Sequence, residues 1–257
     1  MLGMLLDDCF FSDFHLQEVD NPLFIIGNAR SGTTLCHRLL ANYDDQFTSM
    51  QLWEILFGVS VTWRLLFYML YDLDQCYLSG FINYLIRILD KQTLGRLPAH
   101  PFSLFEMEED EWLMMHIFSS QLVLLFFPCG LSVYKCLSTM PCLPNFEQDL
   151  TIKQQDYILL YYKSCIQRHL YARRLLRHIK NNSFVSFSPT LHTIPTLYYI
   201  SKNPTFTVRL NALSRAFPTA KFACMIRDPV EAVPSMVAYI ATVSNLLYIL
   251  KSMYACI

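Results

Sequence analysis

One segment near the N-terminus of this 257-residue chain constrains the fold more than any other. Leu23–Ile26 is a short apolar run, which is typical of a buried parallel strand. Gly27–Gly32 follows as a tight loop, and Thr33–Tyr43 has the pattern of a helix. One face of that helix carries three leucines, Leu35, Leu39 and Leu40. A strand, a glycine-bounded loop and a helix in this order predict an α/β fold with an anion site at the helix N-terminus.

The last third of the chain returns to alternating strands and helices. Leu197–Ser201 and Lys221–Ile226 are predicted strands, and Val208–Phe217 between them is a predicted helix. Pro229 is placed to begin another helix. This alternation predicts a parallel sheet with its ligand at the carboxyl ends of the strands.

The middle of the chain, about residues 51–180, is predicted to be a helical insertion into a single domain that spans 1–257. Ile152–Lys180 has the pattern of one long helix. Four basic residues lie near the end of that helix, Arg173, Arg174, Arg177 and Lys180. Basic side chains suit the C-terminal end of a helix dipole, so we interpret them as a solvated face.

Composition narrows the possible partners. The formal net charge is −1, so no general electrostatic attraction to nucleic acid is expected. The nine cysteines have neither zinc-site spacing nor CxxC pairs, and we interpret most of them as buried, reduced thiols. This predicts no metal site and favours a cytoplasmic location.

The glycine-bounded loop differs from an ATP-binding loop at one position. Gly27 and Gly32 have the spacing of that loop, but Thr33 stands where its lysine would neutralise phosphate charge. A cation, Arg30, lies within the loop instead, and Thr34 adds a second hydroxyl donor. An ATPase or GTPase is therefore disfavoured.

A second candidate anion anchor lies at the end of the chain's last predicted strand. Arg227 ends this strand, and Ser235 follows eight residues later. An arginine at the carboxyl end of such a strand faces the ligand crevice, and its guanidinium suits a phosphate. The alternative is an ordinary surface turn through Arg227 and Asp228.

These blocks together resemble the sulfotransferase family, in particular the broad group related to tyrosylprotein sulfotransferases. Phe24–Leu35 is similar to the family's 5′-phosphosulfate loop, with Ala29 in place of the usual proline. Arg227–Ser235 resembles its 3′-phosphate motif, and Lys202–Arg209 resembles a further block of the tyrosylprotein enzymes.

The resemblance implies 3′-phosphoadenosine 5′-phosphosulfate as the sulfuryl donor and no metal. It implies that the 5′ end of the donor binds at the loop, through Arg30, Ser31, Gly32, Thr33, Thr34 and Leu35. Arg227 and Ser235 would hold the 3′-phosphate, and Arg30 and Lys202 would stabilise the bridging oxygen.

The same resemblance implies that Glu54 is the base that deprotonates the acceptor hydroxyl. Other candidates for this role are Glu109, Asp110, Glu111 and His116. A non-catalytic or kinase-like nucleotide-binding protein is the alternative function, distinguished by whether adenosine 3′,5′-bisphosphate or ATP with magnesium stabilises the fold.

The aromatic middle region suggests a hydrophobic pocket for a small-molecule or lipid-like hydroxyl acceptor, such as a lipid, sterol or phenol. The alternatives are that these residues simply form core and that the acceptor is a carbohydrate or a protein tyrosine. Ala232–Leu250 contains no charged residue, so association with a membrane is an alternative to a purely cytoplasmic location. The sequence also reads as C-terminally incomplete, since related enzymes continue further. We therefore expect an exposed apolar face on the last helix, made of Val237, Ile240, Leu246, Leu247 and Leu250. The oligomeric state is left open.

Overall fold

The computed structural model describes residues 2–43, 46–96, 102–120, 145–181 and 196–254, with side chains left out at 180–181, 240 and 243–254. Its centre is a four-stranded sheet in the order β2–β3–β1–β4. The strands are β1 (Leu23–Gly27), β2 (Phe47–Thr48), β3 (Tyr198–Lys202) and β4 (Lys221–Met225). Every pairing is parallel, so the predicted α/β class with a parallel sheet flanked by helices is confirmed.

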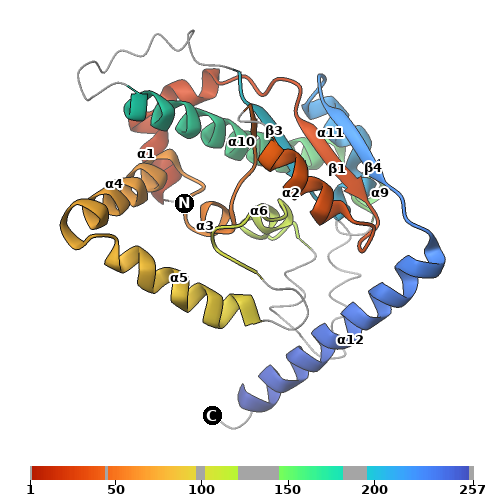
Figure 1. The fold of residues 1–257 in the computed structure, drawn as a ribbon. Helices are drawn as coiled ribbons and strands as arrows, with labels where there is room; N and C mark the ends of the chain where they lie inside the picture. Colours follow the sequence, from red (N-terminus) through yellow and green to blue (C-terminus); the bar gives the residue numbers. More distant parts are fainter. Residues whose placement is uncertain (1, 44–45, 97–101, 121–144, 182–195, 255–257) are drawn as a thin grey trace.

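Helices cover both faces of this sheet (Figure 1). On one face α2 (Thr33–Tyr43) packs over β1 and β3, where Ile25, Ala41 and Ile200 form a small core cluster. On the other face lie α10 (Ile152–Asn181) and α11 (Leu210–Ala216). Successive strand residues point to opposite faces, so Phe24 enters this second, larger core while Ile25 enters the first.

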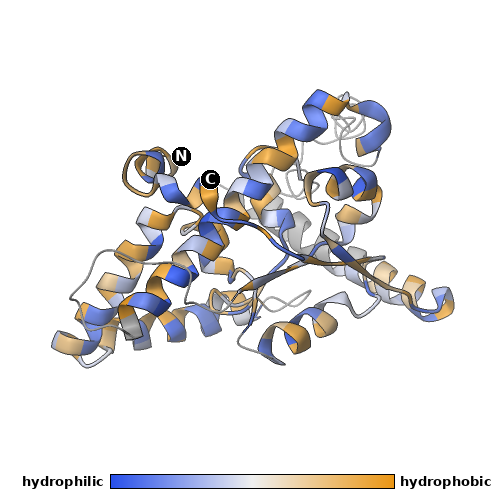
Figure 2. Cartoon of the chain, turned by 90° about the horizontal axis from the view of Figure 1, so that it is seen from above, coloured by the Kyte–Doolittle hydropathy of each residue, from blue (hydrophilic) through white to orange (hydrophobic). Residues whose placement is uncertain are grey.

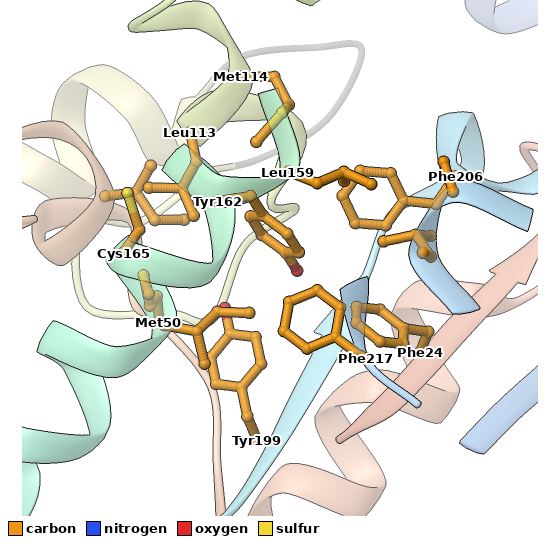
Figure 3. Packing of buried hydrophobic residues seen from close by; sticks show 14 of the residues in the cluster. Phe24, Met50, Leu113, Met114, Leu159, Tyr162, Cys165, Tyr199, Phe206 and Phe217 are labelled. Carbon is orange, nitrogen blue, oxygen red and sulfur yellow. The ribbon is translucent and has the colours of Figure 1, made fainter. Parts of the chain in front are cut away.

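The larger core is strongly aromatic. Figure 3 shows the rings of Phe24, Tyr162, Phe206 and Phe217 gathered between β1, α10 and the segment after β3. The ring of Phe24 lies 5.4 Å from that of Phe217 and 6.1 Å from that of Phe206, between centroids. This cluster fixes the long helix α10 against the sheet and so fixes the carboxyl edge of β1 and β3.

The face of α2 that packs on the sheet is not the one that the leucines suggest. The buried residues of α2 are Thr33, His37 and Ala41, whereas Leu35 and Leu39 are exposed. His37 can be buried because its Nε2 forms a 2.7 Å hydrogen bond with Ser49 Oγ. A polar side chain with one hydrogen-bonded ring nitrogen thus takes the core position that an apolar count would give to leucine.

The predicted helical middle is confirmed for the residues described. It contains α3 (Leu52–Leu56), α4 (Val61–Leu78), α5 (Phe81–Thr93), η2 (Leu94–Arg96), α6 (Glu111–Met115) and α9 (Phe146–Asp149). Before the sheet come α1 (Leu2–Phe10) and η1 (Ser12–Leu16), and η4 (Pro204–Arg209) follows β3. The stretch 121–144 of the predicted insertion lies outside the described residues.

Several helices leave apolar side chains exposed, and Figure 2 shows the apolar bands on the outer helices. On the α4–α5 pair these include Met69, Leu73, Tyr77 and Leu89. The cysteines in the described residues are all free thiols. Cys9, Cys76 and Cys224 are exposed and, of those described, only Cys165 is buried, so the prediction that most cysteines are buried does not hold for them.

The last helix, α12 (Pro229–Tyr254), begins at Pro229 as predicted and runs away from the sheet (Figure 1). Val230, Val233 and Val237 on its first turns are exposed, which agrees with the apolar face predicted at Val237. The side chains of the other residues predicted for that face lie outside those described: Ile240, Leu246, Leu247 and Leu250. Of the helices in the described ranges, none has the length and apolarity required to cross a membrane.

Candidate functional site

The loop between β1 and α2 requires its two glycines for different reasons. Gly27 has φ +129°, and a Cβ there would lie 2.4 Å from the carbonyl oxygen of Met225 on β4. Gly32 has φ +84°, and a Cβ there would project into open space. Arg30 between them also has a positive φ, 67°. The loop is therefore tightly packed at Gly27, has a left-handed turn at Arg30 and is open at Gly32. It leads into the N-terminus of α2, where backbone N–H groups lack helical partners.

The structure brings the loop together with the predicted second anchor. The Arg30 Nε donates a 3.0 Å hydrogen bond to Ser235 Oγ, across 205 residues of sequence. The Arg227 guanidinium donates to the backbone oxygen of Arg30 at 3.1 Å and pairs with Glu231. Register explains this meeting, because β4 lies beside β1 with Gly27 opposite Met225, so both chains leave the sheet at one edge.

Lys202 reaches the same edge from the other neighbour of β1. It lies opposite Ile25 in the pairing of β3 with β1, and the amide of the next residue, Asn203, donates to the Ile25 carbonyl at 3.2 Å. The side chain of Lys202 is buried, and its Nζ forms an ion pair with Glu109. Glu109 itself is partly exposed, at 32% of its side chain. The pair thus presents one accessible carboxylate next to a buried ammonium group.

Two residues that the sequence did not single out belong to this edge. Glu108 is buried next to Lys202 and Glu109, and burial raises its pKa to about 7, although the Lys202 charge acts against the rise. Tyr239 of α12 is half-buried within electrostatic range of Glu108, Glu109 and Arg30, and the Arg30 guanidinium lies 5.8 Å from its ring centroid. Glu108 could have been suspected from the acidic run 106–111, whereas no sequence signal identified Tyr239.

Glu54, the first candidate for the base, lies in a different environment. It is fully buried in α3, and both carboxylate oxygens have partners. Arg64 Nη1 donates to Oε1 at 3.2 Å, and Arg173 Nη2 and the Gln51 amide donate to Oε2 at 3.1 and 2.9 Å. A capping box and two ion pairs are a structural setting for a carboxylate. The interpretation of Arg173 as part of a solvated face was wrong, because Arg173 reaches inward to this buried carboxylate.

The other candidate bases differ in accessibility. Asp110 is fully buried, and the Tyr162 and Tyr199 hydroxyls donate to it; burial raises its pKa to about 6, against the effect of these bonds. Glu111 is buried and accepts from Asn203 and Thr205. His116 lines an apolar cavity beside Trp63 and Phe67, and its pKa is lowered by burial. Of the candidates in the described part of the chain, Glu109 alone combines partial exposure with a contact to Lys202.

A parallel sheet with a glycine-bounded loop after an inner strand, and with Lys202 and Arg227 at the ends of the two neighbouring strands, is typical of P-loop-like α/β proteins. Sequence comparison narrows this class. A model described as "Sulfotransferase family" matches residues 135–253, slightly less than half of the chain. The matched residues include the Arg227 segment but not the loop, and they support the resemblance to this family.

The curated relatives are also named as sulfotransferases. Proteins of Mycobacterium bovis and Mycobacterium tuberculosis, each named omega-hydroxy-beta-dihydromenaquinone-9 sulfotransferase Stf3, are 26% identical over 223 residues, covering 85% of this chain and 45% of the relative. The chain therefore spans slightly less than half the length of these relatives. The solved structure of sulfotransferase STF9 from Mycobacterium avium superposes with a TM-score of 0.60 at 18% identity, covering 95% of this chain and 52% of that one, which supports the fold.

Proposed function

We propose that this chain binds 3′-phosphoadenosine 5′-phosphosulfate and takes part in transfer of its sulfuryl group to a hydroxyl of an apolar acceptor. The observation that carries the proposal is the hydrogen bond from Arg30 in the loop to Ser235 on α12, with Arg227 beside them. A donor with anionic groups at both its 5′ and 3′ positions requires two such anchors within reach of one another. A nucleotide with 5′-phosphates alone requires only the loop.

The positions of the side chains support the following roles. The 5′ end of the donor is bound by Arg30, by the backbone amides at Ser31–Leu35 and by the hydroxyls of Thr33 and Thr34. Arg227 and Ser235 bind the 3′-phosphate, for which Arg227 exchanges its contact with Glu231. The buried Lys202 ammonium, with Arg30, offsets negative charge on the oxygen that leaves sulfur.

We propose Glu109, in place of Glu54, as the general base. Glu109 is accessible and lies next to Lys202, whereas Glu54 is enclosed by its arginines. The acceptor hydroxyl gives its proton to Glu109 while its oxygen forms the new bond to sulfur. The bond from sulfur to the 5′-phosphate oxygen breaks, and adenosine 3′,5′-bisphosphate leaves. Charge stabilisation and positioning by these residues account for the reaction without a metal.

An apolar alcohol is the proposed class of acceptor. The curated relatives are named for an omega-hydroxylated menaquinone, which is such an alcohol. The helical part of this chain contains an apolar cavity of about 380 Å³, lined by Met4, Leu56, Phe57, Val59, Trp63 and Phe67. A lipid-like molecule fits a lining of this kind.

The test is a transfer assay with donor carrying labelled sulfur and long-chain primary alcohols as acceptors. We expect labelled sulfate ester with the unchanged chain and none with Arg30→Ala, while Asp228→Asn, a change at an exposed neighbour of Arg227, retains activity. Stabilisation of the fold by ATP with magnesium, and none by adenosine 3′,5′-bisphosphate, would instead favour a kinase-like protein.

A further inference from the structure

A second cavity, of about 400 Å³, lies along β2 at the edge of the sheet. Its lining is polar and comes from α2, β2, α4 and α10. The side chains that matter here are Asn42, Ser49, Gln51, Tyr68, Arg173 and Arg177. No residue of the loop 27–32 and neither Arg227 nor Ser235 lines it, so it is separate from the proposed donor site.

Next to this cavity, the carboxylate of Glu54 forms ion pairs with two guanidinium groups. Glu54 lies 3.2 Å from Arg64 Nη1 and 3.0 Å from Arg173 Nη2. Within the described part of the chain, no second carboxylate forms an ion pair with either arginine. Tyr68 also contacts Arg173, at 3.4 Å, but its pKa is raised by burial, so its hydroxyl carries no charge at neutral pH.

Two further titratable neighbours of Arg64, Tyr199 and His169, are neutral, and burial raises the pKa of Tyr199 well above its ordinary value. Arg64 Nη1 lies 2.5 Å from His169 Nδ1 and can only donate, so that ring nitrogen is the acceptor. The other nitrogen, Nε2, then carries the hydrogen and donates to Thr48 Oγ1 at 2.8 Å. Burial and the charge of Arg64 lower the pKa of His169 in the same sense.

The cluster therefore carries a net charge of about +1: two arginines, one glutamate and a neutral histidine. Buried charges in proteins are normally balanced, and an uncompensated one is costly. Two donors of the cluster also lack a hydrogen-bond partner, Arg64 Nη2 and Arg173 Nε. Arg64 is sealed from solvent, but Arg173 is 28% exposed and lines the cavity, so within the described part of the chain the excess charge is accessible from the cavity.

We propose that the β2-edge cavity binds an oxyanion, a phosphate, sulfate or carboxylate group, through Arg173, with Gln51, Ser49 and Tyr68 as neutral hydrogen-bonding groups. The cavity is larger than an inorganic ion, which makes the anionic group of a larger molecule the expected occupant. The proposal goes beyond the donor site and stands whether or not the chain transfers sulfate.

Trp53 provides a local probe for the test. Its indole N–H donates a 2.7 Å hydrogen bond to Gln51 Oε1 at the cavity wall. Inorganic phosphate is titrated into the full chain at constant ionic strength, and the ¹⁵N-indole resonance of Trp53, assigned with Trp53→Phe, is followed. We expect a saturable shift. An anion bound only at the loop near Arg30 would leave this resonance unmoved, so the result does not depend on the proposed function.

Three variants separate a binding role from a structural one. Arg173→Gln is expected to weaken phosphate binding about tenfold or more, the effect of one lost charged hydrogen bond. Arg174→Gln, at the adjacent position and outside the cavity lining, changes it by less than about twofold. Glu54→Gln removes the balancing carboxylate, so it should tighten phosphate binding severalfold while lowering the stability of the phosphate-free protein.

If Arg173→Gln does not fold, the direction of the change in phosphate affinity caused by Glu54→Gln still tests the proposal. Phenyl phosphate binding more tightly than inorganic phosphate assigns the site to a larger molecule, and equal affinity assigns it to the free ion. An unshifted Trp53 resonance, a shift reproduced by chloride, or unchanged affinity in Glu54→Gln would overturn the proposal.

Discussion

At the scale of single residues, the most informative contrast is between two glutamates. Glu54 and Glu109 are both carboxylates close to cations, but Glu54 is enclosed and Glu109 is partly open. Residue type and order along the chain could not distinguish them, because the partners of Glu54 lie 10 and 119 residues away. The distinction is set by tertiary packing around α3, α4 and α10.

This contrast predicts opposite effects of two isosteric substitutions. Glu109→Gln should lower kcat about 100-fold or more with donor affinity near normal, since it removes the proposed base. Glu54→Gln should leave most of kcat in the folded fraction but lower the free energy of unfolding by about 3 kcal/mol, since the buried Arg64 and the partly exposed Arg173 lose their carboxylate. Turnover assays and urea denaturation separate the two. A fully active Glu109→Gln enzyme would return the role of base to another carboxylate.

The raised pKa of Glu108 predicts how the stability of the protein depends on pH. In the unfolded chain its carboxyl loses its proton near pH 4.5, whereas in the folded protein burial keeps the proton until about pH 7. Between these values the folded state binds more protons than the unfolded state, so this residue lowers stability as pH rises from 4.5 to 7. Glu108→Gln should remove that loss, on the order of 1–3 kcal/mol, from urea midpoints measured across the window. An unchanged pH slope in Glu108→Gln would show that Glu108 is ionised throughout.

At the scale of elements, local sequence patterns predicted the strands of the sheet but did not predict which faces of the helices are buried. β1, its loop and the start of α2 were predictable because an apolar run, two glycines and a helical period lie within one short segment. The inward face of α2 was not, because the burial of His37 depends on Ser49, a partner outside the helix. The meeting of Arg30 and Ser235 followed only from the expectation that parallel strands end at one edge.

The N-terminal helix α1 has a structural role that a sequence pattern does not reveal. Asp7 is fully buried and accepts hydrogen bonds from the amides of Val61 and Thr62 at 2.9 and 2.8 Å, so it caps α4 from another element. It also pairs with the buried Arg168 of α10 at 2.9 Å. One carboxylate therefore joins three helices.

We predict that Asp7→Ala destabilises the protein by about 3–5 kcal/mol, since a buried arginine loses its partner and a helix loses its cap. Asp8→Ala is the matched control, because Asp8 also contacts Arg168 but is 48% exposed, and it should cost less than about 1 kcal/mol. Thermal and urea unfolding measure both. Similar losses in the two variants would contradict the cap.

At the scale of the whole molecule, the proposed nucleotide site is shared by distant parts of the chain. The loop comes from the first fifth of the sequence and Arg227 with Ser235 from the last, and β4 beside β1 joins them. The family could be predicted because both motifs are short and local. The groups near this site, Glu108 and Tyr239, could not be predicted, and neither could the separate cluster of arginines around Glu54, since each depends on packing between distant segments.

The most direct test of this site compares two nucleotides in a titration calorimeter. Adenosine 3′,5′-bisphosphate and adenosine 5′-monophosphate differ only in the 3′-phosphate that Arg227 is proposed to bind. As a control, Glu231→Gln frees Arg227 from its ion pair and should leave bisphosphate binding equal or tighter. For Arg227→Ala, we predict a loss of roughly ten- to a hundredfold in affinity for the bisphosphate and little change for the monophosphate. Equal losses for the two nucleotides would contradict this prediction.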